Sequence, residues 1–574
     1  MASALPRINP TYIHWLSQQS MLGSANTYIE QVSGTTRIWQ NTGVEERFKV
    51  FLEACPSWLA VNPHLTTHFG PIMRSYASRE RLAAIKAQGL QGLFLAPSGE
   101  TATIWSSSSN QGDPTGLDQV SFGLAQELGT ANDLERLIST LNESNFQLGG
   151  LLPPAATGIG PDFMLELRAA PGFQGLYAVV EIPRKYWQAL PECNDEWVIK
   201  PLPKNVWADL SQAGYLPVSF MRDKLPWGAE SGWATTGVVR CADGTERRWA
   251  YYYADNPKRP VFLWQDPSGH ARKIYSAAVI RHTGLQQQSL AGLSLGSMFG
   301  LESTTPDADL SKVGLESLLE PGLSALGTIS QEIRRYGGWA LLTDQFAPKA
   351  TKYLLAKTDF VRDNYTQAAF DYGLQTGDAE PLKNMVRLAI DEHIPYKRLA
   401  HGVLNFERTS WLPLLDLPNG QDLVTRAKNF PKLTDKLARE VFWAGLPGIL
   451  FVQDDLLPST ETLGRAARFK TPPKIDLSPI LVARQKFKVA QGELLAPLAS
   501  NKATIALVNS LPNRQYWLTC VNFSEQAQKI ETQLPKSCSV MQEFISSGGV
   551  RISGRHLTVN LAPKEVKAVL LQTH

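Results

Sequence analysis

Eight short apolar segments, separated by longer stretches with helical periodicity, restrict the folds available to this chain. Each segment has the length and the aliphatic or aromatic content of a buried β-strand. Amphipathic helices are predicted between them, for example over 78–88, 131–141 and 378–392. Because parallel strands are joined by crossover helices, eight such units predict an α/β fold, a closed (β/α)8 TIM barrel. The predicted strands are 57–61, 92–96, 148–152, 290–294, 339–342, 359–361, 399–403 and 449–452.

One connection is too long for a single crossover helix. The stretch 158–267 is rich in Pro, Trp and Tyr and contains its own β-rich run at 237–251. Within that run, Asp243-Gly244 is typical of a hairpin turn. We therefore expect an inserted subdomain over 158–267, after the third strand of a barrel formed by 51–157 and 268–480.

The two ends of the chain have different patterns. The first fifty residues predict a helical extension, with an amphipathic segment that opens at Pro10. From residue 481 the pattern changes to short strands and turns, which predicts a C-terminal antiparallel β-sandwich domain over 481–574. Its predicted strands are 504–508, 516–522, 557–561 and 566–571.

Charge balance and cysteine usage exclude several classes of partner. Lys and Arg number 56 and Asp and Glu number 53, for a net charge of +3, which favours neither nucleic acid nor an anionic membrane surface. The start of the chain lacks a signal-like segment, and no apolar run reaches the ~18 residues of a membrane helix. We therefore expect a cytoplasmic protein. The five cysteines form no Cys-x-x-Cys pair, which favours reduced thiols over disulfides.

No metal or cofactor is expected. His64 and His68 are four residues apart, but no acidic or cysteine partner lies nearby to complete a metal shell. The glycines at 292, 296 and 300 match neither the dinucleotide nor the phosphate-loop pattern, so close packing at the barrel mouth explains them better.

A series of short phrases then resembles one enzyme family in order and spacing, from the first strand to the C-terminus. The chain resembles glycoside hydrolase family 13, the α-amylase superfamily, and within it the trehalose synthase branch of maltose glucosyltransferases. The phrases are Asp118 to Phe122, Leu128 to Thr130, Thr157 to Phe163, Pro171 to Pro183, Ala234 to Arg240, Glu246 to Trp249 and Thr376 to Glu380.

This resemblance implies where sugar-binding and nucleophilic groups should lie on the third and fourth strands. The family's third strand supplies an Asp and then a His that bind sugar, and these positions hold Leu151 and Ala156 here. The fourth strand normally reads Arg-x-Asp, where the Asp is the nucleophile. Counting back from 299–302 places Gly292 at the Arg position and Ser294 at the Asp position. A serine hydroxyl does not replace a carboxylate as nucleophile and leaving group in this chemistry.

The fifth and seventh strands carry the remaining catalytic positions. The general acid is expected shortly after Gly337-Gly338, at Thr343, whose hydroxyl is too weak an acid for that role. Asp344 is adjacent, but side chains alternate along a strand, so it should face the helices unless the strand bulges. The seventh strand's Asn-His-Asp reads Asn-Phe406-Glu407-Arg408 here, which keeps a longer carboxylate and replaces the histidine by an aromatic ring.

Two functions remain after these substitutions. The first is a catalytically inactive member of the superfamily that serves as a non-catalytic subunit or binding protein, with an active paralogue or a second copy as its protein partner. The alternative is an active α-glucan or maltose/trehalose hydrolase or glucosyltransferase in which Glu407 pairs with Asp344 or Asp118. Glu407 is explained equally well as the ion-pair partner of Arg408, and Asp118 as a loop or helix-cap carboxylate.

The inserted subdomain carries many tryptophans and tyrosines, among them Trp187, Trp233 and Trp249. Aromatic rings can stack on the apolar faces of sugars, so an α-glucoside is a candidate ligand. The same rings can equally form the core of the insertion or a subunit interface.

Overall fold

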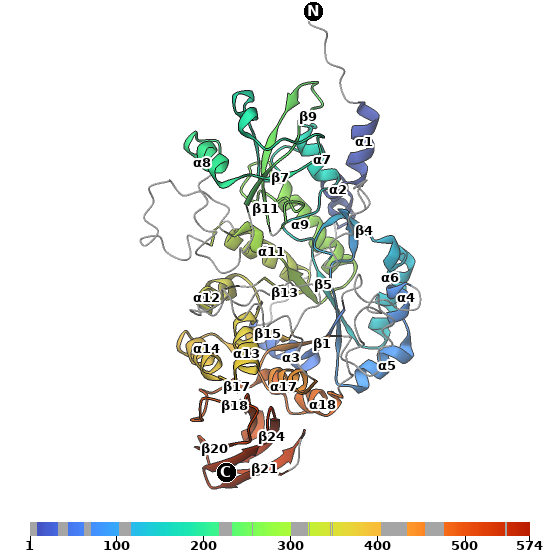
Figure 1. The fold of residues 1–574 in the computed structure, drawn as a ribbon. Helices are drawn as coiled ribbons and strands as arrows, with labels where there is room; N and C mark the ends of the chain where they lie inside the picture. Colours follow the sequence, from blue (N-terminus) through green and yellow to red (C-terminus); the bar gives the residue numbers. More distant parts are fainter. Residues whose placement is uncertain are drawn as a thin grey trace, which may run out of the picture. The chain divides into compact units, whose positions relative to one another are not determined.

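The computed structural model describes most of the chain (Figure 1). The described residues are 9–32, 44–61, 71–102, 116–216, 232–254, 256–299, 319–320, 322–344, 346, 348–402, 433–453, 476–545 and 548–574. They fall into two compact units. Unit 1 comprises Met1–Trp39, Ala96–Ala131 and Gly150–Asp344, and unit 2 comprises Gln40–Leu95, Asn132–Gly149 and Gln345–His574.

The predicted barrel is confirmed. Eight parallel strands close in the order β1-β16-β15-β14-β13-β12-β5-β2. Most of their residues are fully buried, as expected for strands covered by helices on the outside. The strands are β1 (Ser57–Val61), β2 (Gly92–Leu95), β5 (Gln147–Leu151), β12 (Leu290–Leu293), β13 (Trp339–Leu342), β14 (Phe360–Arg362), β15 (Leu399–Gly402) and β16 (Ile449–Gln453).

Close packing inside the barrel explains one of its glycines. Gly92 of β2 lies opposite Trp58 of β1 in the parallel register. A Cβ atom at position 92 would come within 2.4 Å of the Trp58 ring. Trp58 is fully buried, so any larger residue at 92 would displace it.

The helices follow the predicted pattern, and several have side-chain caps. Ser78 accepts the Arg81 N–H at the start of α5, and Asp363 accepts the Thr366 N–H at the start of α13. Within the described ranges, no helix is both long and apolar enough to cross a membrane. Among the described residues, the helices with at least nine residues are α1 (Pro10–Gln19), α2 (Met21–Val32), α3 (Val44–Ala54), α5 (Arg79–Ala87), α6 (Ala131–Glu143), α8 (Lys204–Gln212), α9 (His270–Val279), α11 (Gly322–Arg335), α12 (Pro348–Lys357), α13 (Asn364–Thr376), α14 (Glu380–Asp391), α17 (Leu433–Ala444) and α18 (Ser478–Lys486); α4 (Ile72–Tyr76) and α7 (Pro161–Leu167) are shorter.

The N-terminal helices are held by a carboxylate from far along the chain. Asp162, in α7, accepts hydrogen bonds from the Met21 and Leu22 N–H groups at 2.7 and 3.0 Å. It thereby caps the N-terminus of α2, where the N–H groups have no partner within the helix. Helix α2 is thus tied to α7, whereas the predicted extent of the helical extension and of the insertion stays a prediction.

The insertion has its own antiparallel sheet in the order β6-β11-β8-β7, and the predicted hairpin is present as β9 paired with β10. At its turn Gly244 has a positive φ of 87°, and Asp243 Oδ1 accepts the Thr245 N–H at 2.9 Å. A further hairpin, β3 paired with β4, had not been predicted. These strands are β3 (Gly99–Thr101), β4 (Gln119–Leu124), β6 (Val179–Glu181), β7 (Lys200–Pro201), β8 (Gly232–Thr235), β9 (Val239–Arg240), β10 (Glu246–Arg247) and β11 (Trp249–Tyr253).

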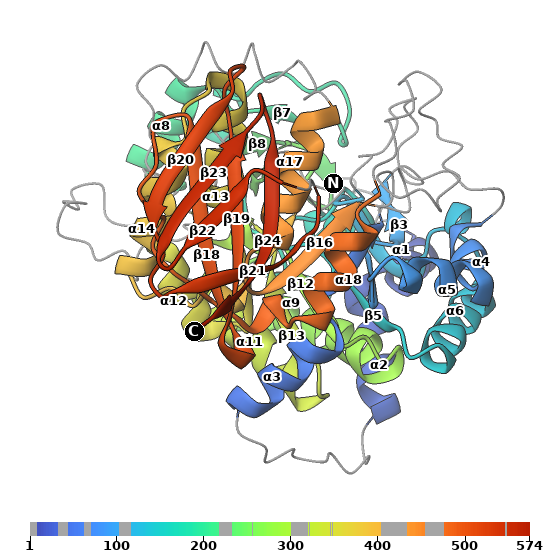
Figure 2. The same cartoon turned by 90° about the horizontal axis from the view of Figure 1, so that it is seen from below.

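The C-terminal strands form the two predicted antiparallel sheets (Figure 2). Five strands pair in the order β17-β18-β19-β24-β21 and three in the order β20-β23-β22. Alternate apolar residues of both sheets, such as Leu518 and Val559, share one buried core. The domain boundaries predicted above stay predictions. The strands are β17 (Glu493–Leu494), β18 (Thr504–Leu511), β19 (Gln515–Asn522), β20 (Gln528–Gln533), β21 (Cys538–Glu543), β22 (Val550–Ser553), β23 (His556–Leu561) and β24 (Val566–Thr573).

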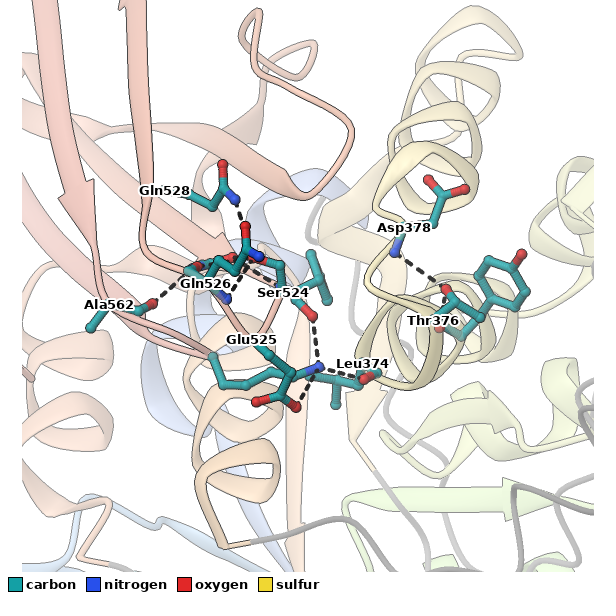
Figure 3. A network of polar contacts seen from close by, with 12 residues as sticks. Leu374, Thr376, Asp378, Ser524, Glu525, Gln526, Gln528 and Ala562 are labelled. Carbon is teal, nitrogen blue, oxygen red and sulfur yellow. Dashed lines mark hydrogen bonds and ion pairs between the residues drawn. The ribbon is translucent and has the colours of Figure 1, made fainter.

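Lysine side chains connect this sandwich to helices of unit 2. The Lys564 ammonium donates to the carbonyl of Leu374 in α13 at 2.7 Å and to that of Phe523, just after β19, at 2.6 Å. Figure 3 shows Leu374 close to Ser524 and Glu525 of the turn that follows β19. Lys383, in α14, similarly donates to the carbonyls of Ser500 and Asn501. These contacts fix the sandwich to α13 and α14.

Replacing Lys564 by methionine should lower the free energy of unfolding by ~1–3 kcal/mol, because buried carbonyls would lose a charged donor. The side chain is only 12% exposed, so water cannot readily replace the ammonium. Urea unfolding would measure the change. Lys502→Met is the matched control, since its ion pair with Asp378 is 74% exposed on the lysine side, and it should have little effect. An equal loss of unfolding free energy in both variants would contradict the proposed role of Lys564 in connecting the sandwich to α13.

Candidate active site at the ends of β12 and β13

The fourth and fifth barrel strands, β12 and β13, are paired neighbours in unit 1. In a (β/α)8 barrel, the residues that follow such strands form the functional face. Ser294 follows β12, and Asp344 lies two residues beyond the end of β13. The Ser294 hydroxyl donates a hydrogen bond to Asp344 Oδ1 at 3.2 Å. The serine at the predicted nucleophile position therefore contacts a carboxylate.

The Asp344 carboxylate is held by the turn after β12. Its Oδ2 accepts the Leu295 N–H at 2.6 Å, and the Gly296 N–H also favours the charged form. A Cβ atom at Gly296 would lie 2.8 Å from Asp344 Oδ1, so only glycine allows this approach. Residues 296–298 form a short 3-10 helix. Asp344 thus caps that helix from the neighbouring strand.

Burial raises the pKa of Asp344 to about 6. The backbone donors at Leu295 and Gly296, the Ser294 hydroxyl and the positive charge of Arg259 oppose this shift in part. Arg259 comes from the end of the insertion and donates to the Ala156 carbonyl at 3.4 Å. Sequence reasoning missed Arg259, because a lone arginine in a long insertion has no pattern that relates it to a strand end.

The expected orientation of Asp344 toward the helices is wrong. That expectation assumed regular alternation, but β13 ends at Leu342 and the backbone bends at Asp344. Thr343 instead donates its hydroxyl to the Leu293 carbonyl at 3.0 Å and is buried. The side chain that meets Ser294 is therefore Asp344 and not Thr343.

The positions where the resemblance implies sugar-binding side chains, Leu151, Ala156 and Gly292, are occupied by residues without polar side-chain atoms. Leu151 and Ala156 are 2% and 1% exposed. Ala156 forms an isolated bridge with Val261 of the insertion. Gly292 lies within β12, where its carbonyl accepts the Leu152 N–H at 2.9 Å. None of these three residues has a side chain that could form a hydrogen bond with a sugar hydroxyl.

Asp118 directly precedes β4 and is 7% exposed. Its carbonyl accepts the Ala102 N–H at 3.1 Å, which closes the β3–β4 hairpin. The structure therefore places Asp118 in that hairpin. Glu407, Phe406 and Arg408 lie outside the described residues, as do His64 and His68.

The aromatic residues of the insertion serve mainly its own packing. Trp233, Trp249 and Tyr251 are less than 9% exposed, within the sheet built by β8 and β11. Tyr251 packs edge-on against Phe163 at a centroid distance of 5.0 Å. Among the residues that the structure describes, no group of three or more His, Cys, Asp or Glu side chains could hold a metal ion.

The chain was compared with protein families, with curated proteins and with solved structures, and only the solved structures match it. Neither a protein-family model nor a curated protein matches the sequence. An α-amylase from H. orenii matches with 11% identity over 91% of this chain and 100% of the other, at a TM-score of 0.59. An isomaltulose synthase mutant from Erwinia rhapontici NX5, in complex with sucrose, matches with 12% identity over 91% and 99%, at a TM-score of 0.58. The chain has an α-amylase-type fold.

A further match extends this similarity. The trehalulose synthase MutB is 12% identical, covers 91% of this chain and 100% of its own, and has a TM-score of 0.58. The resemblance to the α-amylase superfamily is thereby confirmed at the level of the fold. The α-amylase-type fold places Ser294 and Asp344 at the face where enzymes with (β/α)8 barrels carry their active sites.

Proposed function

We propose that this protein is a catalytically inactive relative of the trehalose synthase branch, which acts as a non-catalytic subunit or binding protein. The observation that carries the proposal is the contact between Ser294 and Asp344, in which the predicted nucleophile position supplies a hydroxyl donor and not a carboxylate. Retaining glycoside chemistry needs two carboxyl groups ~5 Å apart, one to attack and one to donate a proton.

A serine nucleophile activated by Asp344 would not rescue turnover. If Ser294 attacked the sugar, the product would be an O-glycoside of serine, and an alkoxide is a much poorer leaving group than a carboxylate. The second half of a retaining reaction would then stop at the covalent stage. A hydroxyl at this position therefore supports loss of catalysis even with a base beside it.

The arrangement around Asp344 also supports a structural role. Its two oxygens accept from the Ser294 hydroxyl and the Leu295 N–H. A general acid must instead aim an O–H at the glycosidic oxygen, which would break at least one of these contacts. We infer that the carboxylate stabilises the turn after β12.

Purified protein should not hydrolyse or transfer glucose from maltose, trehalose, sucrose or maltooligosaccharides. Asp344→Asn should leave this null result unchanged while lowering the melting temperature, because a side-chain amide caps the turn less well than a carboxylate. Product formation by chromatography and thermal unfolding would measure both. Turnover by the wild type that disappears in Asp344→Asn would overturn the proposal.

One observation favours the alternative, an active enzyme with a rebuilt carboxylate pair. A carboxyl group with a pKa of about 6 is suited to donate a proton near neutral pH, and Asp344 has that value. In this case Glu407 would supply the second carboxylate, and Glu407→Gln and Asp344→Asn would each abolish sugar turnover. Saturable sugar binding without turnover would instead indicate a binding protein, and co-purification with an active paralogue would indicate a subunit.

A further inference from the structure

The first two helices carry an unusually long stretch without charged side chains. Residues 8–29 contain no Asp, Glu, Lys or Arg, whereas 22 residues at the chain's average of 19% would carry about four. In the described part of this stretch, 9–29, ten residues are exposed. Exposed helix positions of a soluble protein are normally occupied by charged residues. Depletion of charge on an exposed surface is the compositional signal of the central part of a protein interface.

Two aromatic rings of α1 are exposed on this uncharged surface. Tyr12 and Trp15 are 39% and 45% exposed, and their ring centroids lie 6.0 Å apart at an interplanar angle of 25°. Such exposure is uncommon for large apolar side chains here. Among the described residues of unit 1 it is found only at Tyr12, Trp15, Val198, Val238 and Leu285.

A buried arginine connects these rings to the insertion. Helix α1 packs against α7 (Figure 1), and Arg168 is the C-cap residue of α7. Its guanidinium lies 5.8 Å from the Tyr12 ring centroid and 5.0 Å from that of Trp197. The charge of Arg168 is compensated, because the side chain donates to Glu196 Oε1 at 2.7 Å and to the Arg240 carbonyl at 3.2 Å. We call the resulting row of side chains the α1 face, which consists of Trp15, Tyr12, Arg168 and Trp197.

Two exposed valines extend the α1 face along the insertion. Val198 follows Trp197, and Val238 follows Gly237. A Cβ atom at Gly237 would lie 2.0 Å from the Asp195 carbonyl oxygen, so these two segments are in contact. Four of the five exposed apolar side chains of unit 1 therefore lie in the α1 face or next to it. Scattered apolar side chains are ordinary on a surface, but a cluster marks an interaction site, and Trp, Tyr and Arg contribute most to binding at such sites.

We propose that the α1 face binds a second copy of this chain and forms a two-fold symmetric dimer. In such a dimer the same surface lies on both sides of the contact, so a face without charges meets another face without charges. The net charge of +3 is too small to oppose this association at long range. The exposed residues of the stretch 9–29 and the two valines are fewer than the ~20–30 residues per side of a standard interface. The dimer should therefore be reversible, with a Kd of about 1–100 µM.

This proposal rests on the subunit form of the proposed function, for which it names the partner and the surface. The two can fail separately. Turnover of a sugar would overturn the proposed function whether or not the protein dimerises. A protein that stays monomeric and shows no turnover would overturn the dimer alone.

Analytical ultracentrifugation of the full chain from about 1 to 200 µM tests the association. The weight-average mass should rise from that of one chain toward that of two. Hydroxyl-radical footprinting of the same samples should show that oxidation of Tyr12 and Trp15 falls several-fold as the dimer forms. Oxidation of Met541, which is 51% exposed and lies in β21, should stay constant. A monomeric mass up to about 200 µM, or a dimer in which Trp15 is oxidised as fast as in the monomer, would overturn the proposal.

Variants test the location of the contact. Tyr12→Glu with Trp15→Glu should raise the Kd at least about tenfold, because it removes both rings and places like charges on the two sides of the contact. Leu285→Glu with Met541→Glu adds the same charge at exposed apolar positions outside the α1 face and should leave the Kd unchanged. Tyr12→Ser with Trp15→Ser should weaken the dimer without adding charge, and melting temperatures show whether each variant is folded.

Equal Kd values for the two glutamate double variants, both folded, would refute the assignment to the α1 face. Maltooligosaccharides provide the test of a different occupant. If they protect Trp15 from oxidation in a protein that stays monomeric, the α1 face binds a sugar and the dimer proposal is wrong.

Discussion

Replacing Arg484 by methionine should lower the free energy of unfolding by about 3–5 kcal/mol. Arg484 lies in α18 and is fully buried. Its guanidinium donates to the carbonyls of Ala444, Leu446 and Gly448, which follow one another between the end of α17 and the start of β16. Methionine fills a similar volume but donates nothing, so three buried carbonyls would lose their partner at ~1–3 kcal/mol each.

Part of this loss is offset, because methionine also removes a charge from the interior. Burial lowers the pKa of Arg484 to about 9, which shows that the protein disfavours the charge there, although the side chain stays protonated at neutral pH. The net loss should therefore be smaller than the sum over three carbonyls. Urea unfolding followed by tryptophan fluorescence would measure it.

Lys486→Met provides the control on the same helix. Lys486 is exposed and packs over the Phe487 ring, so its loss should leave the free energy of unfolding almost unchanged. Arg484→Lys should recover only part of the stability, because one ammonium cannot reach three carbonyls as the planar guanidinium does. If Arg484→Met were as stable as Lys486→Met, the hydrogen bonds from Arg484 to the three carbonyls would not contribute to stability as predicted.

Stability should fall as the pH rises from about 4.5 to 8, and Glu166 should dominate the upper part of this window. Burial raises the pKa of Glu166 to about 8, although the Gly175 and Tyr177 N–H groups donate to its two oxygens. Between its unfolded and folded pKa values the folded state binds the extra proton, so raising the pH disfavours folding. The slope should approach ~1.4 kcal/mol per pH unit. Asp162 and Asp344 act in the same direction only up to about pH 6.

Glu166→Gln should flatten the stability profile between pH 6 and 8. The variant should also be less stable than the wild type near pH 5, because its NH2 group would face one of the two backbone donors. Thermal unfolding of the wild type and of Glu166→Gln at several pH values would measure both stability profiles. Glu181→Gln, at an exposed glutamate of the insertion, should keep the wild-type slope. A wild-type profile that is flat or rising between pH 6 and 8 would contradict the assignment to Glu166.

The barrel could be predicted from sequence because its strands are short, fully buried and separated by helices with clear apolar periodicity. β1 and β13 have the predicted bounds, β5 and β14 are shifted by one residue at both ends, and the other barrel strands differ by one residue at one end. The β3–β4 hairpin escaped prediction because its first strand, Gly99–Thr101, is too short for any periodic pattern. The six-residue π-helix after α9 was missed for a different reason, because its sequence simply continues the helical pattern of α9.

The site was harder to predict than the fold. Ser294 could be placed by counting along the chain, since β12 is regular up to Leu293. Asp344 could not, because the direction of its side chain depends on where β13 ends, and strand ends are the least certain part of a pattern. Arg259 lowers the pKa of Asp344 only because the insertion folds back and brings its positive charge near that carboxyl group, and no local sequence pattern encodes this arrangement.

The cap that Asp162 places on α2 has a consequence for synthesis of the protein. The bonded residues are 140 and 141 positions apart, so ribosomes adding ~5–20 residues per second would make the partner of α2 roughly 7–28 s after α2 itself. During this interval the first N–H groups of α2 lack the Asp162 carboxylate that accepts their hydrogen bonds in the folded protein. Nascent chains stalled before residue 162 should therefore bind chaperones through this segment, and chains stalled beyond the insertion should not.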